Sequence, residues 1–256
     1  MWNLYDELIE NIPDNICARD VRIGNCWGYV STDNSCGIGV MYPVESRLPL
    51  YTNDWTGKPL KDIASCAKSW NFIEASVGIA AINCYYNSME QASINQIKIP
   101  SSNFAEDRMN DPFISYQKQI KNKNVTVVGH FPYLETLFEP VCNLSIIETN
   151  PEIGDYPFPA SEYLLPDSDY VFITCGTLSD KTLPRLLELA ENAYTVLVGP
   201  ATPLTPILFK YGVNNMSGFI FQDLEKADRI LTGGKFGTLY STGHKVFLCN
   251  GEKSNI

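Results

Sequence analysis

Several patterns that often reveal a function are missing from this 256-residue sequence. It has no Gly-x-Gly-x-x-Gly run, which is the usual phosphate-binding turn of a dinucleotide site. It has no Gly-x-Ser-x-Gly, which disfavours a serine hydrolase of the α/β-hydrolase type. The eight cysteines form no Cys-x-x-Cys pair, so a zinc-ribbon site is not indicated, and we expect most of them to be reduced thiols packed as small apolar groups.

Basic residues are also scarce. The chain has 19 Lys and Arg against 29 Asp and Glu, which gives a net charge of -10. Nucleic acids and anionic membrane surfaces are bound through clustered cations, so we expect neither as a partner. No apolar run approaches the roughly 18 residues of a spanning helix, and the N-terminus lacks the basic start and apolar segment of a signal peptide. We therefore expect a cytoplasmic protein, and leave open whether it forms a homo-oligomer.

The first part of the chain, residues 1–110, is predicted to be an α+β domain. Its pattern indicates a helix over 2–11, strands over 19–30 and 36–42 joined as a hairpin, and helices over 59–68 and 71–86. The second of these helices is almost wholly apolar, so it must be covered on most sides. From Asn87 to Asn110 the chain is polar and irregular, which is typical of a linker or a loop over a cleft.

Residues 111–256 are predicted to be a Rossmann-like, mostly parallel α/β domain, because strand and helix patterns alternate there. After a helix over 113–121, the expected strands cover 125–129, 144–148, 169–174, 195–199, 217–221 and 245–249, and the expected helices cover 132–139, 181–192, 204–210 and 223–230. No long helix precedes the 169–174 strand. If that crossover is missing, this strand can lie beside 125–129 and bring residues 174–177 next to His130.

The segment from Val125 to Pro132, followed by a strand that ends at Glu148, has the layout of the first half of a nucleotide-binding βαβ unit. Glu148 stands where an acidic residue contacts ribose, although a solvated strand end explains it equally well. The turn itself reads Gly-His-Phe-Pro, and its bulky ring and proline obstruct a close approach of phosphate. NAD and FAD are therefore not expected.

Ligands of open α/β sheets bind beyond the carboxyl ends of the strands, and small or polar residues gather there in this chain. His130 is one of only two histidines and directly follows a strand, so we predict it as an acid/base or a metal ligand. The other histidine, His244, is expected in a solvated turn with no role. The run from Gly199 to Pro203 is read equally well as a binding loop or as the start of a helix. Mixed metal ligands are offered by His130, Glu148, Asp155, Glu162 and Cys175, without the close spacing of a helix-borne site.

Four ordered motifs carry a family resemblance: Val-Gly-His-Phe-Pro at 128–132, the run 164–174, Gly-Thr-Leu at 176–178 and the run 198–206. They resemble the DUF364 family, described as a heavy-metal chelation domain, and the segments 57–64 and 69–83 resemble the DUF4213 domain that precedes it. The resemblance implies an enolase-N-terminal-like domain followed by a Rossmann-like domain, with a site between them. It also implies that the site residues are Asn83, His130, Phe131, Thr174, Gly176, Thr177, Gly199, Pro200, Thr202 and Pro203. The family often has Asn where this chain has Asp180.

Three functional hypotheses remain open at this point. The first is a protein that handles a metal or a metal-containing cofactor, with a small anionic or metal-chelating ligand in the interdomain cleft, a transition-metal ion as the cofactor, and His130 and Cys175 as metal ligands. The second is a nucleotide-using enzyme in which Glu148 contacts ribose. The third is a non-catalytic carrier or regulator that uses the same cleft. The residues do not decide whether the protein is an enzyme.

Overall fold

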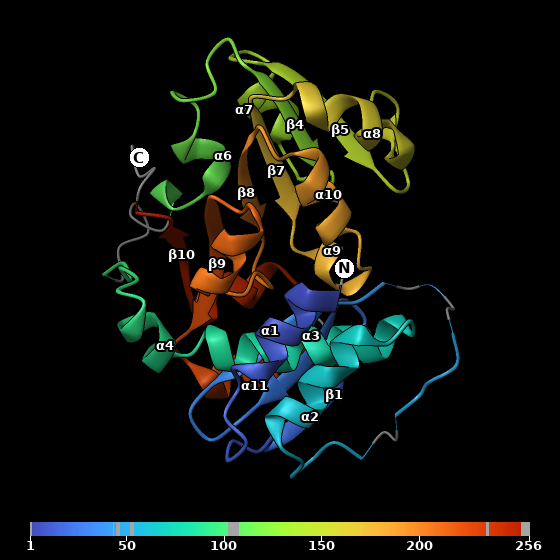
Figure 1. The fold of residues 1–256 in the computed structure, drawn as a ribbon. Coiled ribbons are helices and arrows are strands. Elements are labelled where there is room, and N and C mark those ends of the chain that lie inside the picture. The colour runs from blue at the N-terminus through green and yellow to red at the C-terminus, as the bar shows by residue number, and fades with distance from the viewer. Residues whose placement is uncertain are drawn as a thin grey trace.

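A computed structural model of the protein describes residues 2–42, 44, 47–51, 54–101, 108–233 and 236–251. Figure 1 shows the N-terminal elements gathered at one end of the molecule and a long twisted sheet rising from them. Within the described ranges, no helix has the length and apolar character needed to span a lipid bilayer.

The N-terminal part contains a three-stranded antiparallel sheet in the order β1-β2-β3, formed by β1 (Asp20–Ile23), β2 (Trp27–Ser31) and β3 (Cys36–Val40). We expected one strand over 19–30, but the chain turns at 24–26, where the Gly24 N–H donates to the Trp27 carbonyl at 2.9 Å. The result is two paired strands in place of one. The expected 36–42 strand ends at Val40.

Helices cover one face of this sheet. The long helix α3 (Phe72–Tyr86) begins at Asn71, whose side chain accepts from the N–H groups of Ile73 and Glu74, as an N-cap should. It packs so closely on β3 that a Cβ at Gly39 would lie 2.1 Å from the Ser76 carbonyl oxygen, and one at Gly37 would lie 2.1 Å from the Cys84 nitrogen. The other helices of this part are α1 (Trp2–Glu10), α2 (Leu60–Ala64), the 3-10 helix η1 (Ser65–Lys68) and α4 (Met89–Ile94).

The C-terminal part is built on a seven-stranded sheet, in the order β10-β9-β8-β7-β4-β5-β6 among the described residues. Its strands are β4 (Asn124–Val128), β5 (Asn143–Glu148), β6 (Tyr156–Pro157), β7 (Tyr170–Thr174), β8 (Tyr194–Val198), β9 (Asn215–Phe221) and β10 (Gly243–Cys249). All pairings are parallel except that between β9 and β10. The fold is thus mixed α/β with a mostly parallel sheet, as the sequence predicts.

Several local expectations were wrong. The linker over 87–110 contains α4, although residues 102–107 lie outside the described residues. The helix over 113–121 is only the single turn α6 (Pro112–Ser115), and that over 204–210 is the 3-10 helix η4 (Pro206–Tyr211). His244 is in β10 instead of a solvated turn. It is only 7% exposed, and its Nε2 lies 3.0 Å from Gln222 Oε1.

The remaining elements are α7 (Leu134–Phe138), η2 (Phe158–Ala160), α8 (Ser161–Leu164), η3 (Leu165–Asp167), α9 (Gly176–Ser179), α10 (Leu183–Leu189), α11 (Leu224–Gly233) and η5 (Phe236–Thr242).

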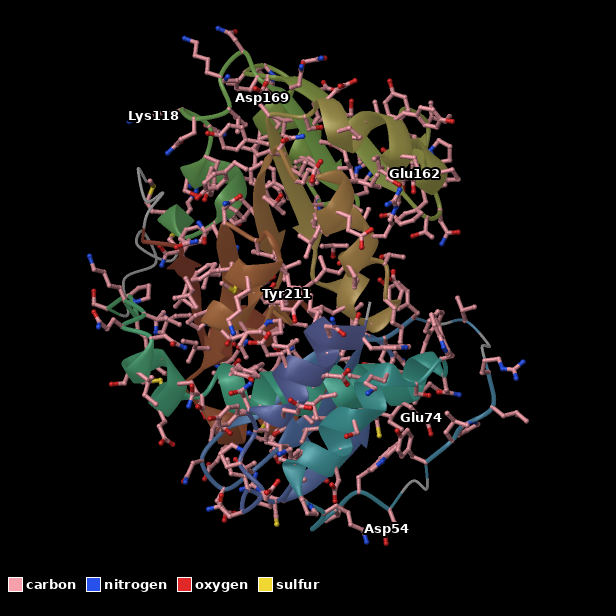
Figure 2. All side chains as sticks on the ribbon, in the orientation of Figure 1. Asp54, Glu74, Lys118, Glu162, Asp169 and Tyr211 are labelled. Atoms are coloured by element: carbon pink, nitrogen blue, oxygen red, sulfur yellow. The ribbon has the colours of Figure 1, made fainter. Side chains whose placement is uncertain are left out.

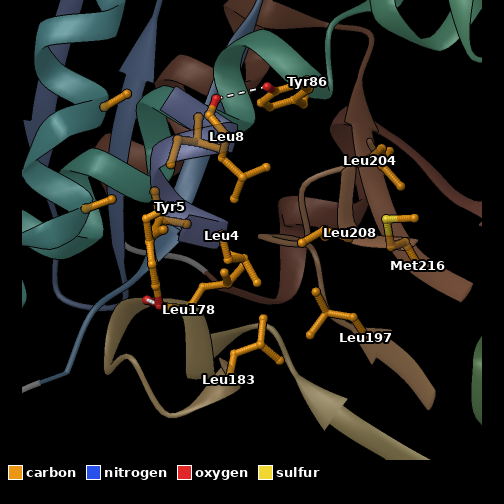
Figure 3. Packing of buried hydrophobic residues seen from close by; sticks show 14 of the residues in the cluster. Leu4, Tyr5, Leu8, Tyr86, Leu178, Leu183, Leu197, Leu204, Leu208 and Met216 are labelled. Atoms are coloured by element: carbon orange, nitrogen blue, oxygen red, sulfur yellow. Dashed lines mark hydrogen bonds between the residues drawn. The ribbon is translucent and has the colours of Figure 1, made fainter. Parts of the chain in front are cut away.

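A continuous apolar core joins the two parts. Leu4 and Leu8 of α1 pack in one cluster with Leu178 and Leu183 of the C-terminal part (Figure 3), and the Tyr5 hydroxyl donates to the Leu178 carbonyl at 2.8 Å. On the other side, α11 packs on the three-stranded sheet, with Ala227 against residues of β2 and β3. The relative position of the two parts is therefore fixed by buried contacts on two sides.

Candidate functional site

The order in which successive strands are added to the sheet reverses direction between β4 and β7. Strands β5 and β6 extend from β4 to one side, whereas β8 and β9 extend from β7 to the other. In the β4–β7 register Val128 is opposite Ile173, so the loops that follow these strands begin next to each other and then diverge. Asp169, at the start of β7, is at the top of Figure 2, so the carboxyl ends of the strands face the N-terminal part. A crevice at such a reversal is the usual ligand site of open α/β sheets.

A pocket of about 220 Å³ occupies this crevice; we call it the acidic pocket. It is formed by residues after β4, β5 and β7 and is closed by the end of β3. The residues that line it include the carboxylates Glu148 and Asp180 and include no Lys or Arg. The full lining is Val40, Tyr42, Val128, Gly129, His130, Phe131, Ile147, Glu148, Thr149, Phe158, Thr174, Gly176, Thr177 and Asp180.

His130 is held between two carboxylates. Its Nδ1 lies 3.0 Å from Asp155 Oδ2, and its Nε2 lies 3.0 Å from Glu135 Oε1. The Asp155 side chain is only 3% exposed, and the imidazole is 25% exposed. The hydrogen bond to Asp155 raises the pKa of His130 above its usual value, with further contributions from the negative charges nearby. Both ring nitrogens therefore already have partners, and the ring favours its charged form.

Glu148 also has local partners. One carboxylate oxygen accepts the His130 backbone N–H at 3.0 Å, and the other accepts the Thr149 backbone N–H at 2.8 Å. The bond from His130 joins the loop after β4 to the end of β5. The hydroxyl of Thr177 donates to the Thr174 carbonyl at 2.6 Å, so this hydroxyl can offer a ligand only its acceptor lone pairs.

Asp180 is hydrogen-bonded to a residue of the N-terminal part inside the acidic pocket. The Tyr42 hydroxyl donates to Asp180 Oδ2 at 3.1 Å, and the N–H and hydroxyl of Thr182 donate to Oδ1 at 2.9 and 2.6 Å. Burial raises the pKa of Asp180 in spite of these donors, and burial likewise raises the pKa of Tyr42. A partly buried carboxylate and a phenol thus face the crevice as a hydrogen-bonded pair.

Lys181, the next residue, is a buried cation. It is 3% exposed, its Nζ donates to the Ser179 carbonyl at 2.8 Å, and it lies 5.7 and 5.8 Å from the ring centroids of Trp70 and Phe72. Burial lowers its pKa to about 8. Its backbone φ of +68° is uncommon for a side chain of this size.

A second pocket, of about 580 Å³, lies beside the first; we call it the aromatic pocket. Six of its lining side chains are large aromatic groups: Trp27, Phe113, Phe131, Tyr133, Phe219 and Tyr240. It shares Val40, His130, Phe131 and Thr174 with the acidic pocket. The other lining residues are Asp111, Pro112, Pro132, Cys175, Val198, Gly199, Pro200, Ser217, Gly218 and Lys245.

Two turns between the pockets require glycine. Gly129 and Gly199 have φ values of +104° and +131°, in the region that side chains disfavour. A Cβ at Gly199 would also lie 2.4 Å from the Cys175 sulfur. These glycines let the chain leave β4 and β8 without filling the crevice.

Three predicted site residues lie away from both pockets. Asn83 is fully buried, and its Nδ2 donates to the carbonyls of Ile38 and Ala201 at 2.8 Å each, which ties the two parts together. Thr202 is also buried, and its carbonyl accepts from Asn87 Nδ2 at 2.9 Å. Neither residue, nor Pro203, is among those that line the acidic or the aromatic pocket.

The residues of this crevice do not fit a self-contained metal site. In the described part of the chain, no three His, Cys, Asp or Glu side chains are grouped so as to hold a metal ion. Cys175 is buried, and burial raises the pKa of its thiol to about 12, whereas metals bind the thiolate. The imidazole of His130 would have to release Asp155 or Glu135 to bind a metal.

Several residues of the crevice were not among the predicted site residues, above all Tyr42, Asp180, Phe113, Phe219 and Lys245. Asp180 had a signal, since it departs from the family pattern. The other four come from elements distant in sequence, so no local motif links them to His130.

Comparison with protein families gives two matches. Residues 111–249 match the model of DUF364, and residues 5–86 match that of DUF4213; each is described as "Putative heavy-metal chelation". The first match alone covers more than half of the chain. The chain belongs to the DUF364 family. The resemblance of its motifs to both families is thereby confirmed.

Known structures and relatives agree with this assignment. A DUF364 protein of unknown function from Desulfitobacterium hafniense DCB-2 is 47% identical, with a TM-score of 0.90 over 98% of this chain and 99% of its own. A second DUF364 protein of unknown function, from Pyrococcus horikoshii, is 21% identical, with a TM-score of 0.78 over 96% and 98%, and is similar in fold. An uncharacterized protein of Methanocaldococcus jannaschii is 29% identical over 203 residues, which are 74% of this chain and 71% of its own.

Proposed function

We propose that this DUF364 protein binds a small organic ligand at the sheet reversal, with a polar, metal-chelating head in the acidic pocket. The observation that carries this proposal is the convergence of His130, Glu148, Asp180 and Tyr42, from four separate segments, on one cavity. A cavity of about 220 Å³ is small for a whole drug-sized molecule, so it suits the head of a larger ligand.

The charge of the acidic pocket favours a cationic head. Among the described residues that line it, the imidazolium of His130 balances the carboxylates, and none is Lys or Arg. The carboxylates of Asp155 and Glu135 lie against the two ring nitrogens of that imidazolium and add further negative charge. A metal complex with a positive charge at the metal would be attracted here, whereas a free phosphate or carboxylate would be repelled.

We propose further that the metal arrives already bound to its organic chelator. The protein offers no group of three metal ligands in its described residues, so it would supply at most one or two, from Asp180 or Glu148. The chelator would supply the remaining ligands. This accounts for the family description of heavy-metal chelation without a protein-borne metal centre.

The test is calorimetric titration with Zn²⁺ alone and with the 1:1 complex of Zn²⁺ and pyridine-2-carboxylate. We expect the complex to bind at least about tenfold more tightly than the bare ion, and Asp180→Asn to remove most of that difference. The matched control is Asp169→Asn, which changes a carboxylate that also accepts a backbone N–H but lies at the amino end of β7. Tighter binding of bare Zn²⁺ would overturn the chelate proposal, and binding of neither probe would overturn the site.

A further inference from the structure

The aromatic pocket is too large and too apolar to serve the same part of a ligand as the acidic pocket. It holds about 580 Å³, within the range of small-molecule sites, and its polar groups are few. Phe113 and Phe131 form one ring pair in its wall, with centroids 4.9 Å apart, and Phe219 and Tyr240 form another, at 5.6 Å. Ring faces and edges of this kind favour a flat, aromatic guest.

The strand order gives the length of this pocket. Phe131 follows β4 and Phe219 is in β9, with β7 and β8 between them. Three strand spacings of about 4.8 Å place the backbones of β4 and β9 roughly 14 Å apart across the sheet. A pocket of this width accepts two fused or linked rings, and a single small ring would leave much of it unfilled.

Lys245 gives the pocket one anchoring charge. In β10 it is paired with Phe219 across the antiparallel ladder, so the two side chains share a face of the sheet. Its Nζ lies 2.6 Å from Asp111 Oδ2 and 4.8 Å from the Tyr240 ring centroid. An ammonium group has three N–H donors, so after the bond to Asp111 it still has donors for a ligand. The other oxygen of Asp111 accepts the Phe113 N–H at 3.1 Å, which fixes the carboxylate.

The rim of the pocket contains a strained aromatic residue. Tyr133 is 78% exposed and has a φ of +67°, which is a genuine outlier for a bulky side chain. Strain of this kind is concentrated at ligand sites.

We infer that the aromatic pocket binds a flat aromatic acid of two rings, with its anionic group paired to Lys245. This rests on the proposed function, because the aromatic acid is the organic body of the ligand whose chelating head enters the acidic pocket. The two pockets share His130, Phe131 and Thr174, so one molecule spans both. The ligand class is thus an aromatic acid with a metal-binding group at the end remote from its anion.

The test uses naphthalene-2-carboxylate, which has no strong metal-binding group, and follows its binding by fluorescence or calorimetry in the absence of metal. We expect the neutral naphthalene-2-carboxamide and acetate each to bind at least about tenfold more weakly, because one lacks the charge and the other lacks the rings. Lys245→Met should weaken the carboxylate at least about tenfold and leave the amide unchanged, and Lys245→Arg should restore much of the loss. The matched control, Lys123→Met, removes the cation of the Lys123–Asp169 pair, on the amino-end side of the sheet.

Melting temperatures of all variants separate a lost contact from a lost fold. If Lys245→Met is too unstable to assay, the ratio of carboxylate to amide affinity in Lys245→Arg and in the natural protein still tests the anchor. Equal affinity for carboxylate and amide in the natural protein, or no binding of either, overturns the inference. Binding of naphthalene-2-carboxylate without binding of the zinc complex leaves the inference standing and refutes the metal-chelating head. Binding of the zinc complex without binding of naphthalene-2-carboxylate refutes the aromatic acid and leaves the metal-chelating head standing.

Discussion

The acidic and aromatic pockets share a wall but are built in different ways. The acidic pocket takes its charged groups from loops that follow strands, and each of these groups has hydrogen-bond partners nearby. The aromatic pocket takes side chains that are also part of the core, such as Phe113 and Phe219. Residues of the first pocket should therefore be replaceable at little cost in stability, whereas those of the second should not.

Phe113→Ala should give the largest effect. Phe113 is 7% exposed and contacts the rings of Phe131, Phe138 and Phe172. Its truncation should lower the free energy of unfolding by about 3 to 5 kcal/mol. Thr149→Ala, an exposed position of the acidic pocket, should change it by about 0.5 kcal/mol or less. Urea unfolding of both variants measures this, and similar losses would erase the contrast between the pockets.

Lys181 extends the comparison of the two pockets to a buried charge, because it is 3% exposed and directly follows Asp180 of the acidic pocket. Its pKa is lowered to about 8, so the unfolded chain binds more protons than the folded one between about pH 8 and 10.4. Stability should thus rise with pH in this range, by at most about 1.4 kcal/mol per pH unit for this group. Lys181→Met should be at least as stable as the natural protein at pH 7 and should lose that rise. Unfolding curves from pH 7.5 to 9.5 would detect it, and an identical slope in both proteins would contradict it.

Tyr42→Phe tests the bond between the two parts inside the acidic pocket. Loss of the hydroxyl that donates to Asp180 should cost about 1 to 2 kcal/mol, because the acceptor is a partly buried carboxylate. A double-mutant cycle with Asp180→Asn isolates the pair, and Tyr163→Phe, at an exposed tyrosine, is the control. A coupling energy near zero would show that the bond does not hold the pocket closed.

Asp155→Asn should have the smallest effect on stability and a clear effect on titration. Asp155 raises the pKa of His130, so this pair stabilises the fold fully below about pH 6.5 and loses its effect as pH rises through the raised pKa. The substitution should lower the pKa of His130, as observed by NMR titration of the imidazole. His244, which is buried beside Gln222, provides the internal reference signal. An unchanged His130 titration would mean that Asp155 does not set its charge.

The sequence predicts the C-terminal sheet well, because runs such as Val125–Val128 and Tyr170–Thr174 are apolar and bounded by turn residues. It also suggests that the 169–174 strand can lie beside 125–129, as the two strands do. It predicts a strand at 245–249 but leaves the antiparallel direction of β10 open, because strand direction depends on the chain path through residues distant in sequence. It also fails for Tyr42 and Asp180, which meet across 138 positions through packing that no local pattern encodes.

The packing of α3 on the glycines of β3 has a consequence for changing what the protein binds. Because Gly37 and Gly39 have no side chains, α3 lies directly against β3, and the end of β3 that leads to Val40 and Tyr42 of the acidic pocket is a closely packed template. A new ligand preference is therefore more accessible through the loops 130–133 and 174–180 than through this template. An engineer who redesigns the crevice should vary those loops in a library and keep Gly37 and Gly39 unchanged. Bulk placed at either glycine would be detected first as poor soluble yield, before any change in ligand choice could be measured.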